Sequence, residues 1–247
     1  MAVNLGSSNI SAVKLGATDV SKIYLGLDVV FGGVAPFEFG NALQFDGIND
    51  YVDFNSQLSS GSSTSFLLNF WFKTSNNNVQ SLIESFTIID GLRIINGTTI
   101  RAFFQNNGYQ NTFTLPSFTD GNWHHVMFGR DIDGTTLKFY FDGVDYSSGS
   151  TTLTILFGRL GQTATNIRPF DGALDEIVFA YEEPTLIKAQ AAYNSGAGNS
   201  IENWLIGSAE LIYHLNESGA DTIAIDSSGN GNNGTLNNFT GTYWVAH

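Results

Sequence analysis

The stretch GNWHHVMFGRDIDGTTLKFYFDG, residues 121–143, contains the pattern that decides the fold of this chain. In its second half, hydrophobic and more polar positions alternate: Leu137, Phe139 and Phe141 on one side, Lys138 and Tyr140 on the other. Successive side chains of a β-strand point to opposite faces, so the alternation predicts a strand with one apolar face. The Asp-Gly pair at 133–134 predicts a hairpin turn before this strand.

Similar short segments continue from Ala42 onward, separated by Gly, Asn, Asp and Ser turns. The segment SFLLNFWFKT, residues 65–74, is apolar on both faces, which predicts a central strand covered on both sides. The pattern as a whole is typical of an all-β sandwich. A single helix is expected in EPTLIKAQAAYNSG, residues 183–196, with Pro184 in its first turn and Asn194 to Gly196 ending it.

The N-terminal segment repeats every ten residues, as LGSSNISAVK, LGATDVSKIY and LGLDVVF. Ten residues suit a short strand plus a turn, so we expect hairpin-like strands over residues 1–34 and the sandwich over residues 35–247. Because so small an arm buries little surface, it is expected to need a partner. The phrasing of residues 15–26 resembles repeats at the N-termini of tailed-phage virion proteins.

Composition limits the classes of function. The chain has 247 residues, 42% of them hydrophobic, so a folded core is expected, and no cysteine is present for disulfides or thiolate metal sites. The formal net charge is −13 and the 10 Lys and Arg residues do not cluster, which argues against nucleic-acid binding. No apolar run approaches the length of a membrane span, and MAVNLGSSNI does not resemble a secretion signal, so we expect no membrane insertion.

Three motifs together resemble a known family. They are ALQFDGINDYVDF (42–54), GNWHHVMFGRDIDGTTLKFYFDG (121–143) and FDGALDEIVFAYEEPTLIKAQAAY (170–193). They look like successive signatures of laminin G-like domains of the concanavalin A-like lectin and glucanase superfamily. The resemblance implies an antiparallel jelly-roll β-sandwich of two sheets, with a short helix after the strand that contains the Asp-Glu pair.

A further phrase of this family is displaced in the chain. DSSGNGNNGTL, residues 226–236, ordinarily precedes the ALQFDG strand, and here it follows AELIYHLNES near the end. Because the chain ends of compact domains often lie close together, we predict that residues 204–247 complete the same sandwich as a circular permutation. The alternative is a second, truncated unit, which would leave these apolar residues exposed: Trp204, Leu211, Phe239 and Trp244.

The sequence gives little support for a catalytic function. His124 and His125 are neighbours in a predicted strand, so one is expected to pack inward and the other to lie on the surface. The superfamily includes glycoside hydrolases with an E-x-D-x-x-E arrangement of paired carboxylates, which this chain lacks. The nearest pairs are Asp131 with Asp133, in the predicted turn, and Asp175 with Glu176, expected to face opposite ways. We therefore expect no enzymatic activity.

Calcium is the cofactor that the sequence favours. Turns rich in Asp, Asn and Gly supply the oxygen ligands that this cation prefers, and related sandwiches often hold a calcium at the rim. The similar positions are Asp226 and Asn230 in the displaced loop and Asp175 on the strand with the Asp-Glu pair. The alternative is that these side chains only hold the loop backbone through Asx-turn hydrogen bonds.

Sugar binding would use an aromatic ring beside polar groups. Tyr51 and Tyr109 are candidates because Asn and Gln residues surround them. The alternatives are that these rings belong to the core and that the Asn residues form turns.

The leading hypothesis is a phage virion protein whose arm docks on the particle or on sister subunits, as a homo-oligomer. The sandwich would then adhere to host surface glycans through many weak contacts. A purely structural head or tail decoration protein is the alternative, and a glycoside hydrolase-like enzyme is the third hypothesis.

Overall fold

The computed structural model describes residues 13–15, 18–20, 23–25, 28–31, 37–106 and 108–247. The chain forms two compact units, Met1–Phe37 and Glu38–His247, so their boundary lies three residues beyond the one expected from the sequence. The first unit contains two antiparallel pairs, β1 (Val13–Leu15) with β2 (Thr18–Val20) and β3 (Ile23–Leu25) with β4 (Asp28–Phe31). Short paired strands are what the ten-residue repeat predicts.

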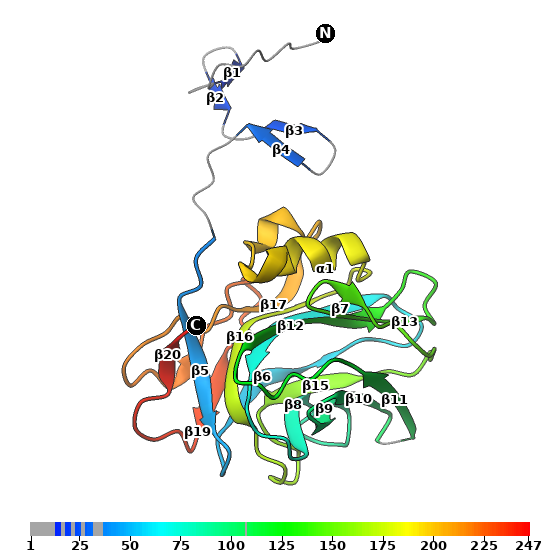
Figure 1. Ribbon diagram of the computed structural model, residues 1–247, viewed down its shortest axis with the longest axis vertical. Helices are drawn as coiled ribbons and strands as arrows, with labels where there is room; N and C mark the ends of the chain where they lie inside the picture. The colour runs from blue at the N-terminus through cyan, green and yellow to red at the C-terminus, as the bar shows by residue number, and fades with distance from the viewer. Residues whose placement is uncertain (1–12, 16–17, 21–22, 26–27, 32–36, 107) are drawn as a thin grey trace. The chain divides into compact units, whose positions relative to one another are not determined.

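The second unit is a sandwich of two antiparallel sheets (Figure 1). The first, called the β6 sheet, contains in spatial order β11 (Tyr109–Thr114), β10 (Thr99–Phe104), β9 (Gly91–Asn96), β8 (Gln80–Glu84), β15 (Leu156–Leu160), β6 (Tyr51–Ser59), β19 (Gly234–Asn237) and β18 (Ile223–Ala224). The second, called the β7 sheet, contains β14 (Val144–Asp145), β13 (Leu137–Phe141), β12 (Trp123–Arg130), β7 (Phe66–Lys73), β16 (Asp171–Ala180), β5 (Asn41–Asp46), β20 (Trp244–Ala246) and β17 (Ala209–Tyr213), which pairs with the second half of β16. The all-β sandwich expected from the sequence is confirmed.

Phenylalanine dominates the core between the sheets. The alternation in the sequence assigns the faces of β7 and β13 correctly, because their core residues are Phe66, Leu68, Phe70, Phe72, Leu137, Phe139 and Phe141. Several rings meet at close range, for example Phe113 and Phe139 with centroids 4.2 Å apart. Burial of these side chains, at roughly 25 cal/mol per Å² of apolar surface, is the main stabilising term for a chain without disulfides.

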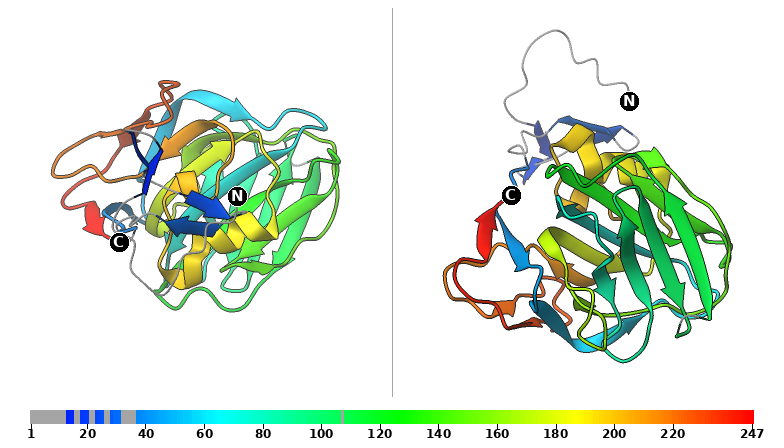
Figure 2. Two further views of the ribbon diagram at one scale, coloured as in Figure 1. Left: turned by 90° about the horizontal axis from the view of Figure 1, so that it is seen from above. Right: turned by 60° about the horizontal axis from the view of Figure 1, so that its bottom comes forward.

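The outer face of the β7 sheet carries a second, smaller core beneath the helix α1 (Leu186–Tyr193). Figures 1 and 2 show this helix on the side of the β7 sheet that faces away from the β6 sheet. This second core consists mainly of Leu67, Met127, Tyr140, Val178, Ala189, Ala192 and Trp204. Two short 3₁₀ turns, η1 (Asn194–Gly196) and η2 (Ile201–Asn203), follow the helix.

The predicted helix is present, but its beginning differs from the expectation. Thr185 is the N-cap, and its hydroxyl accepts a hydrogen bond from the Lys188 backbone N–H at 3.2 Å. Pro184 therefore lies before the cap, and its predicted place in the first turn is wrong. Asn194 ends the helix in the left-handed region with φ 46°.

The C-terminal segment completes both sheets. In this segment β17 pairs with β16, β19 with β6 and β20 with β5, and Figures 1 and 2 show β20 beside β5. Trp204, Leu211 and Trp244 are all buried, and Phe239 packs against the core, so this segment is not a truncated second unit. The two ends of this unit's chain also meet, because the His247 N–H donates to the Gly40 carbonyl at 3.2 Å.

None of the helices in the described part of the chain is both long and apolar enough to cross a membrane.

Candidate functional site

Four residues form one rung across the middle of the β7 sheet. Gln44 of β5 lies opposite Ala173 of β16, Ala173 lies opposite Lys73 of β7, and Lys73 lies opposite Trp123 of β12. Residues that face each other in paired strands share one face of the sheet. Because Phe72 and Phe45, the sequence neighbours of Lys73 and Gln44, belong to the core, this rung faces outward.

A hollow lies next to Gln44 and Lys73 of this rung, where β7 ends and the turn before β12 lies. The groove has a volume of about 230 Å³, and its lining consists of Gln44, Lys73, Thr74, Ser75, Gly121, Asp171 and Gly172. We call it the Lys73 groove. Gly172 allows the strands to approach closely here, because a Cβ atom at this position would lie 2.1 Å from the Lys73 carbonyl oxygen. The groove is therefore bordered by one ammonium, one carboxylate, one amide and two hydroxyl groups.

Asp171 is held in place by its neighbours. Its backbone N–H donates to Gln80 Oε1 at 2.8 Å, and its carbonyl accepts from Thr74 Oγ1 at 2.7 Å. Its carboxylate accepts a hydrogen bond from Asn76 Nδ2 at 3.0 Å. One carboxylate oxygen thus has a fixed partner, which orients the other for a ligand.

Trp123 lies next to Lys73 of the groove, and its ring is fixed on one side. The His247 ring stacks on the Trp123 ring with centroids 3.8 Å apart and an angle of 10°. The Lys73 ammonium lies 4.9 Å from the Trp123 ring centroid. Because the Lys73 side chain is long and flexible, it can move away from this ring at little cost.

The next rung on the same face is covered, and we call it the sealed rung. Asp175 of β16, Trp71 of β7 and His125 of β12 lie opposite one another, and all three are buried. The Tyr193 ring at the end of α1 stacks over Trp71 at 5.8 Å, and His247 Nδ1 lies 2.6 Å from Asp175 Oδ2. A step of two residues along each strand thus separates an open rung from a sealed one.

Burial favours the neutral forms of His125 and Asp175 in the sealed rung, and of His247 beside it. It lowers the pKa of His125 to about 3, because the imidazolium would lose its hydration. It raises the pKa of Asp175 to about 9, with the nearby Glu176 charge adding to the shift. Burial, together with the Lys73 charge, lowers the pKa of His247 to about 3. These shifts favour a protonated Asp175 carboxyl whose O–H donates a hydrogen bond to His247 Nδ1.

A β-bulge in β16 changes the direction in which the side chains of Asp175 and Glu176 point. Glu176 has φ 48°, and the pairing of β16 with β7 shifts between residues 175 and 178. Both residues lie between Leu174 and Ile177, which face the core, so both carboxylates are on the outer side. The expectation that they face opposite ways is wrong. They also have separate partners, because Glu176 Oε2 lies 2.9 Å from His214 Nδ1.

The adjacent histidines do lie on opposite faces, but both are buried. His124 Nδ1 lies 2.8 Å from Asp142 Oδ2, and His125 Nε2 lies 2.6 Å from Asn69 Oδ1. The expected surface position for one of them is wrong, because the second core beneath α1 covers the face that the sequence assigns to solvent.

The displaced loop caps the edge of β17. Asp226 accepts hydrogen bonds from the backbone N–H groups of Ile212, Ser228 and Asn232, at 3.1, 3.0 and 2.8 Å. The Asn230 amide donates to the Ala209 carbonyl at 3.0 Å. These bonds satisfy polar groups at a strand edge that would otherwise be open to pairing with another chain. They include the Asx-turn contact that the sequence left as the alternative to calcium.

The three predicted calcium ligands, Asp175, Asp226 and Asn230, have hydrogen-bond partners of their own. Within the described residues, no hydrogen bond or ion pair links Asp175 to Asp226 or Asn230, and no group of three or more acidic or histidine side chains could hold a metal ion. Burial moreover raises the pKa of Asp175 to about 9, and its Oδ2 lies 2.6 Å from His247 Nδ1. Only Asp226 and Asn230 share a neighbourhood, so calcium binding at this loop stays a prediction.

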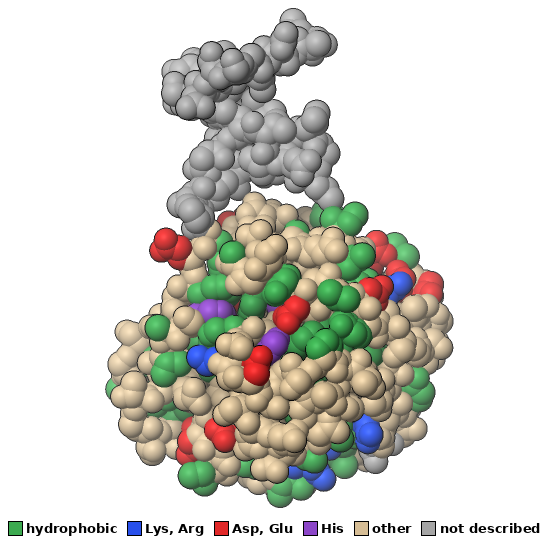
Figure 3. Space-filling model, viewed as in Figure 1, with side chains coloured by type: hydrophobic (Ala, Val, Ile, Leu, Met, Phe, Trp, Pro, Cys, Tyr) green, Lys and Arg blue, Asp and Glu red, His purple; other side chains and the backbone are tan. Residues whose placement is uncertain are grey.

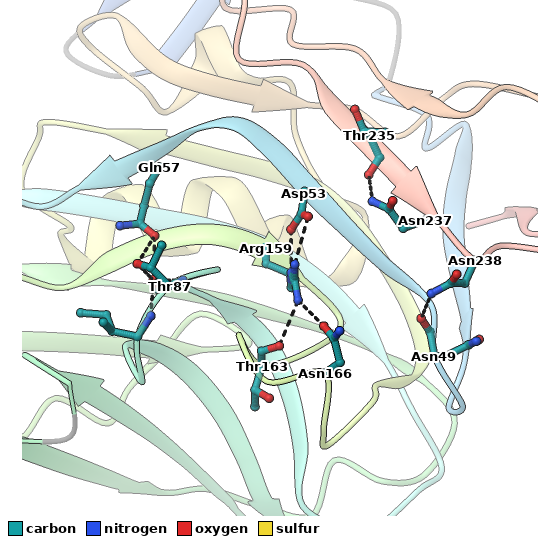
Figure 4. A network of polar contacts seen from close by, with 12 residues as sticks. Asn49, Asp53, Gln57, Thr87, Arg159, Thr163, Asn166, Thr235, Asn237 and Asn238 are labelled. Atoms are coloured by element: carbon teal, nitrogen blue, oxygen red, sulfur yellow. Dashed lines mark hydrogen bonds and ion pairs between the residues drawn. The ribbon is translucent and has the colours of Figure 1, made fainter.

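Tyr51 lies on the outer face of the β6 sheet, in a polar network that Figure 4 shows in part. The Arg159 guanidinium lies 4.1 Å from its ring centroid and donates to both Asp53 oxygens, at 2.6 and 3.0 Å. Arg159 also donates to Asn166 Oδ1 at 2.6 Å. One face of the Tyr51 ring is therefore covered by a cation that Asp53 of β6 and Asn166 of the loop after β15 hold in place.

Tyr109 is half-buried in β11 and packs against the core, with its ring 5.7 Å from Phe104. The carboxylates of the 131–134 turn also have structural partners. Asp131 pairs with Lys138 at 2.9 Å, and Asp133 accepts from the Thr135 and Thr136 N–H groups.

The sequence reasoning missed the residues of the Lys73 groove. Gln44, Asp171 and Trp123 come from three distant motifs, so their proximity depends on strand register. Two local signals were present: Lys73 is the one charged residue of a strand that is apolar apart from Asn69, and Trp123 begins a strand directly after the Gly-Asn turn. Figure 3 shows no gathering of Lys or Arg side chains on the face that it presents.

Comparisons with known proteins agree with this architecture. A laminin G-type family model, described as concanavalin A-like lectin/glucanases superfamily, matches residues 46–185, more than half of the chain. No curated protein matches the sequence.

Among solved structures, a candidate carbohydrate binding protein from Bacteroides ovatus is similar, with a TM-score of 0.60, 18% identity and coverage of 85% of this chain. The chain spans 62% of that protein's length. Mouse laminin α1 domains LG4-5 give a TM-score of 0.43 with 18% identity, over 57% of this chain and 41% of theirs. A heptameric SAP-like pentraxin from Limulus polyphemus gives 0.48 with 12% identity, over 71% and 92%.

Proposed function

Because the chain belongs to the laminin G-type family of the concanavalin A-like lectin/glucanases superfamily, we propose that it is a non-enzymatic carbohydrate-binding protein and that the Lys73 groove is its sugar site. The observation that carries the proposal is the open rung of Gln44, Ala173, Lys73 and Trp123. It places a hollow between polar side chains, next to an indole ring, on four strands that cannot move independently.

The chemistry of the groove suits an uncharged sugar. Lys73 donates hydrogen bonds, Asp171 accepts them, and the Gln44 amide does both, which matches the mixed donors and acceptors of sugar hydroxyls. The Trp123 ring face next to Lys73 can contact the C–H groups of a pyranose once the Lys73 side chain moves away. A negatively charged sugar would meet the Asp171 carboxylate and the overall charge of −13. We therefore assign neutral glycans.

The predicted contacts of Tyr51 and Tyr109 belong to the other sheet. They lie in β6 and β11, whereas the Lys73 groove is on the outer face of the β7 sheet. A short sugar in the Lys73 groove cannot reach them, and Tyr51 lies on the outer face of the β6 sheet whereas Tyr109 packs against the core, so the two tyrosines do not share one surface. The Tyr109 ring packs against the core, and the Arg159 guanidinium lies over the Tyr51 ring.

The biological setting that we propose is a phage virion. The ten-residue repeat and the separate compact unit Met1–Phe37 support an arm that docks on the particle or on sister subunits. Many copies on one particle would raise weak sugar affinity through effective concentration. The adjacent chain ends of the sandwich, joined by the bond from His247 to Gly40, support a circular permutation of the family order.

Glycan binding is tested on the full chain. A glycan array identifies a neutral sugar, and titration calorimetry then compares the parent chain with Lys73→Ala and with the control Arg101→Ala. Arg101 is a cation of the β6 sheet that contacts Thr112 and Gln110. We expect about a tenfold or greater loss of affinity for Lys73→Ala and no loss for the control. An unchanged affinity in Lys73→Ala would refute the assignment of the groove.

The virion setting has its own test. Mass spectrometry of purified particles should detect the chain as a stoichiometric component. If the chain is present in particles but no array sugar binds, the decoration role replaces adhesion. Release of reducing sugars from a bound glycan would instead support the hydrolase hypothesis.

Calcium binding, the cofactor hypothesis, is tested by thermal unfolding with and without a chelator. If Asp226 and Asn230 hold calcium, the chelator lowers the melting temperature of the parent chain and has no effect on Asp226→Ala. No shift in the parent chain would contradict it. Because Asp226 accepts three backbone hydrogen bonds, the variant itself is expected to be less stable by about 1–3 kcal/mol.

A further inference from the structure

A group of isoleucines is exposed around the C-terminal part of the sandwich. Ile206 is 81% exposed, Ile225 is 55% exposed and Ile223 is 47% exposed. Ile212 is half-buried, and its carbonyl accepts a hydrogen bond from the Ser227 N–H at 2.9 Å, which places it beside the segment that carries Ile225. Exposed aliphatic side chains that gather in one region mark interaction sites more often than scattered ones do.

Two grooves lie among these residues. The first has a volume of about 460 Å³ and is lined by Ile201, Glu202, Leu205, Ile206, Gly207, Ser208, Ala209, Ile212, Ser227 and Ser228. The second has a volume of about 420 Å³ and is lined by Glu217, Ala220, Asp221, Thr222, Ile223, Ile225 and Asn233. Ile225 of the second groove is two residues from Ser227 of the first. We call the two grooves together the isoleucine surface.

Every charged side chain that lines the isoleucine surface is acidic. They are Glu202, Glu217 and Asp221, and no Lys or Arg is among the lining residues of either groove. Within the described residues, one Glu217 carboxylate oxygen, Oε2, is also buried without a hydrogen-bond partner, while its other oxygen accepts from the Ile225 N–H at 2.7 Å. The bond to the Ile225 N–H fixes the Glu217 carboxylate beside the second groove.

The surface also has an open strand edge. β18, which contains Ile223, is the last strand of the β6 sheet, so one of its sides has no strand partner among the described residues. Open edges of this kind accept an extended segment from another protein, whose backbone pairs with the strand and whose alternate side chains fill adjacent pockets.

We propose that the isoleucine surface binds a partner protein through an extended segment in which aliphatic residues alternate with Lys or Arg. The aliphatic side chains would cover Ile206, Ile223 and Ile225, and the basic ones would pair with the acidic lining. This site is separate from the Lys73 groove and does not depend on glycan binding.

Charge decides against a second copy as the occupant. A two-fold contact between two isoleucine surfaces would bring Glu217 and Asp221 of one protomer towards the same residues of the other. With a net charge of −13 per chain, such a contact has like charges at its centre. A basic segment has the complementary charge.

The test uses fluorescence anisotropy with the full chain and a short labelled peptide in which lysine and valine alternate. The control peptide has glutamate in place of lysine. The chain variants are Ile225→Ser combined with Ile206→Ser, and, as the matched control, Ile132→Ser, since Ile132 is 77% exposed in the distant 131–134 turn. Because all three positions are exposed, each variant is expected to fold.

We expect the lysine peptide to bind the parent chain and Ile132→Ser equally, and to bind the double variant about tenfold or more weakly. Binding should also weaken as salt is added, and the glutamate peptide should not bind. Equal binding to the double variant, or equal binding of the two peptides, would overturn the proposal. So would a dimer in sedimentation equilibrium that Ile225→Ser dissociates, because the surface would then belong to a second copy.

Discussion

Two rungs of the β7 sheet share the same strands and the same face, yet one is open and the other is sealed. At the β7 position the open rung has Lys73, which lines a groove, whereas the sealed rung has Trp71, with Tyr193 stacked over it. His247 connects the two, because it stacks on Trp123 of the open rung and bonds Asp175 of the sealed one.

The difference shows how a sandwich of this kind separates stability from binding. The side chain at the β7 position and the cover above it decide whether a rung is core or surface. Because the sealed rung fixes His247, and His247 fixes Trp123, the rigid part of the sheet orients the ring next to the groove.

The largest expected effect comes from removing the centre of the sealed rung. Trp71→Ala should lower the free energy of unfolding by about 3–5 kcal/mol, because it deletes a buried indole and leaves a cavity under Tyr193. Lys73→Ala, one rung away, should change it by less than ~0.5 kcal/mol. Urea unfolding of both variants measures this. Similar losses of unfolding free energy in the two variants would contradict the distinction between a structural rung and a surface rung.

The sealed rung should also show a pH dependence that the open rung lacks. Burial lowers the pKa of His125 from its ordinary 6.5 to about 3. Below pH 6.5 the His125 imidazole binds a proton in the unfolded chain but stays neutral in the native chain. The free energy of unfolding therefore falls by about 1.4 kcal/mol per pH unit until the pH approaches 3.

The comparison of parent and His125→Gln isolates this effect. Asp50 and Asp90, whose pKa values burial raises to about 6, act in the opposite direction in both proteins and cancel in the difference. We expect the parent to lose more stability than the variant between pH 6.5 and pH 4.5 in urea unfolding. Parallel curves would contradict a neutral, buried His125.

In the open rung, Gln44→Ala should weaken sugar binding about fivefold, the loss of one hydrogen bond of ~1 kcal/mol. Its unfolding free energy should stay close to that of the parent, because the Gln44 side chain is half-buried and donates to the neighbouring Phe45 carbonyl. Calorimetry and urea unfolding give the two numbers. A stability loss with unchanged affinity would place Gln44 with the structural residues.

The smallest effect is expected for Asp175→Asn. The carboxyl is protonated, so an amide N–H can replace its O–H towards His247 Nδ1, and the change in stability should stay below ~1 kcal/mol. A loss of about 3–5 kcal/mol, the cost of breaking a buried ion pair, would show instead that Asp175 and His247 are charged.

Much of the fold follows from local patterns. The alternation in β13 and the apolar run in β7 assign the correct core faces, and the displaced DSSGNGNNGTL phrase correctly predicts that the C-terminal segment closes the sandwich. These features depend on short-range periodicity and on motif order, which a sequence carries directly.

The site depends on features that a single sequence does not carry. The Lys73 groove requires the register of β5, β16, β7 and β12, which long-range packing sets. The left-handed bulge at Glu176 turns its side chain to the same side as that of Asp175, and no glycine or proline marks it. The cover over His125 comes from the rings of Trp71 and of Tyr193 at the end of α1, so its burial is tertiary as well.

A crystal structure of the full chain with a neutral oligosaccharide from the array tests the central claim most directly. The account predicts a sugar ring in the Lys73 groove, within hydrogen-bond distance of Gln44 and Asp171, with the Trp123 ring beside it and the Asp175–His247 contact unchanged. A sugar bound over Tyr51 on the β6 sheet, with the Lys73 groove empty, would contradict it.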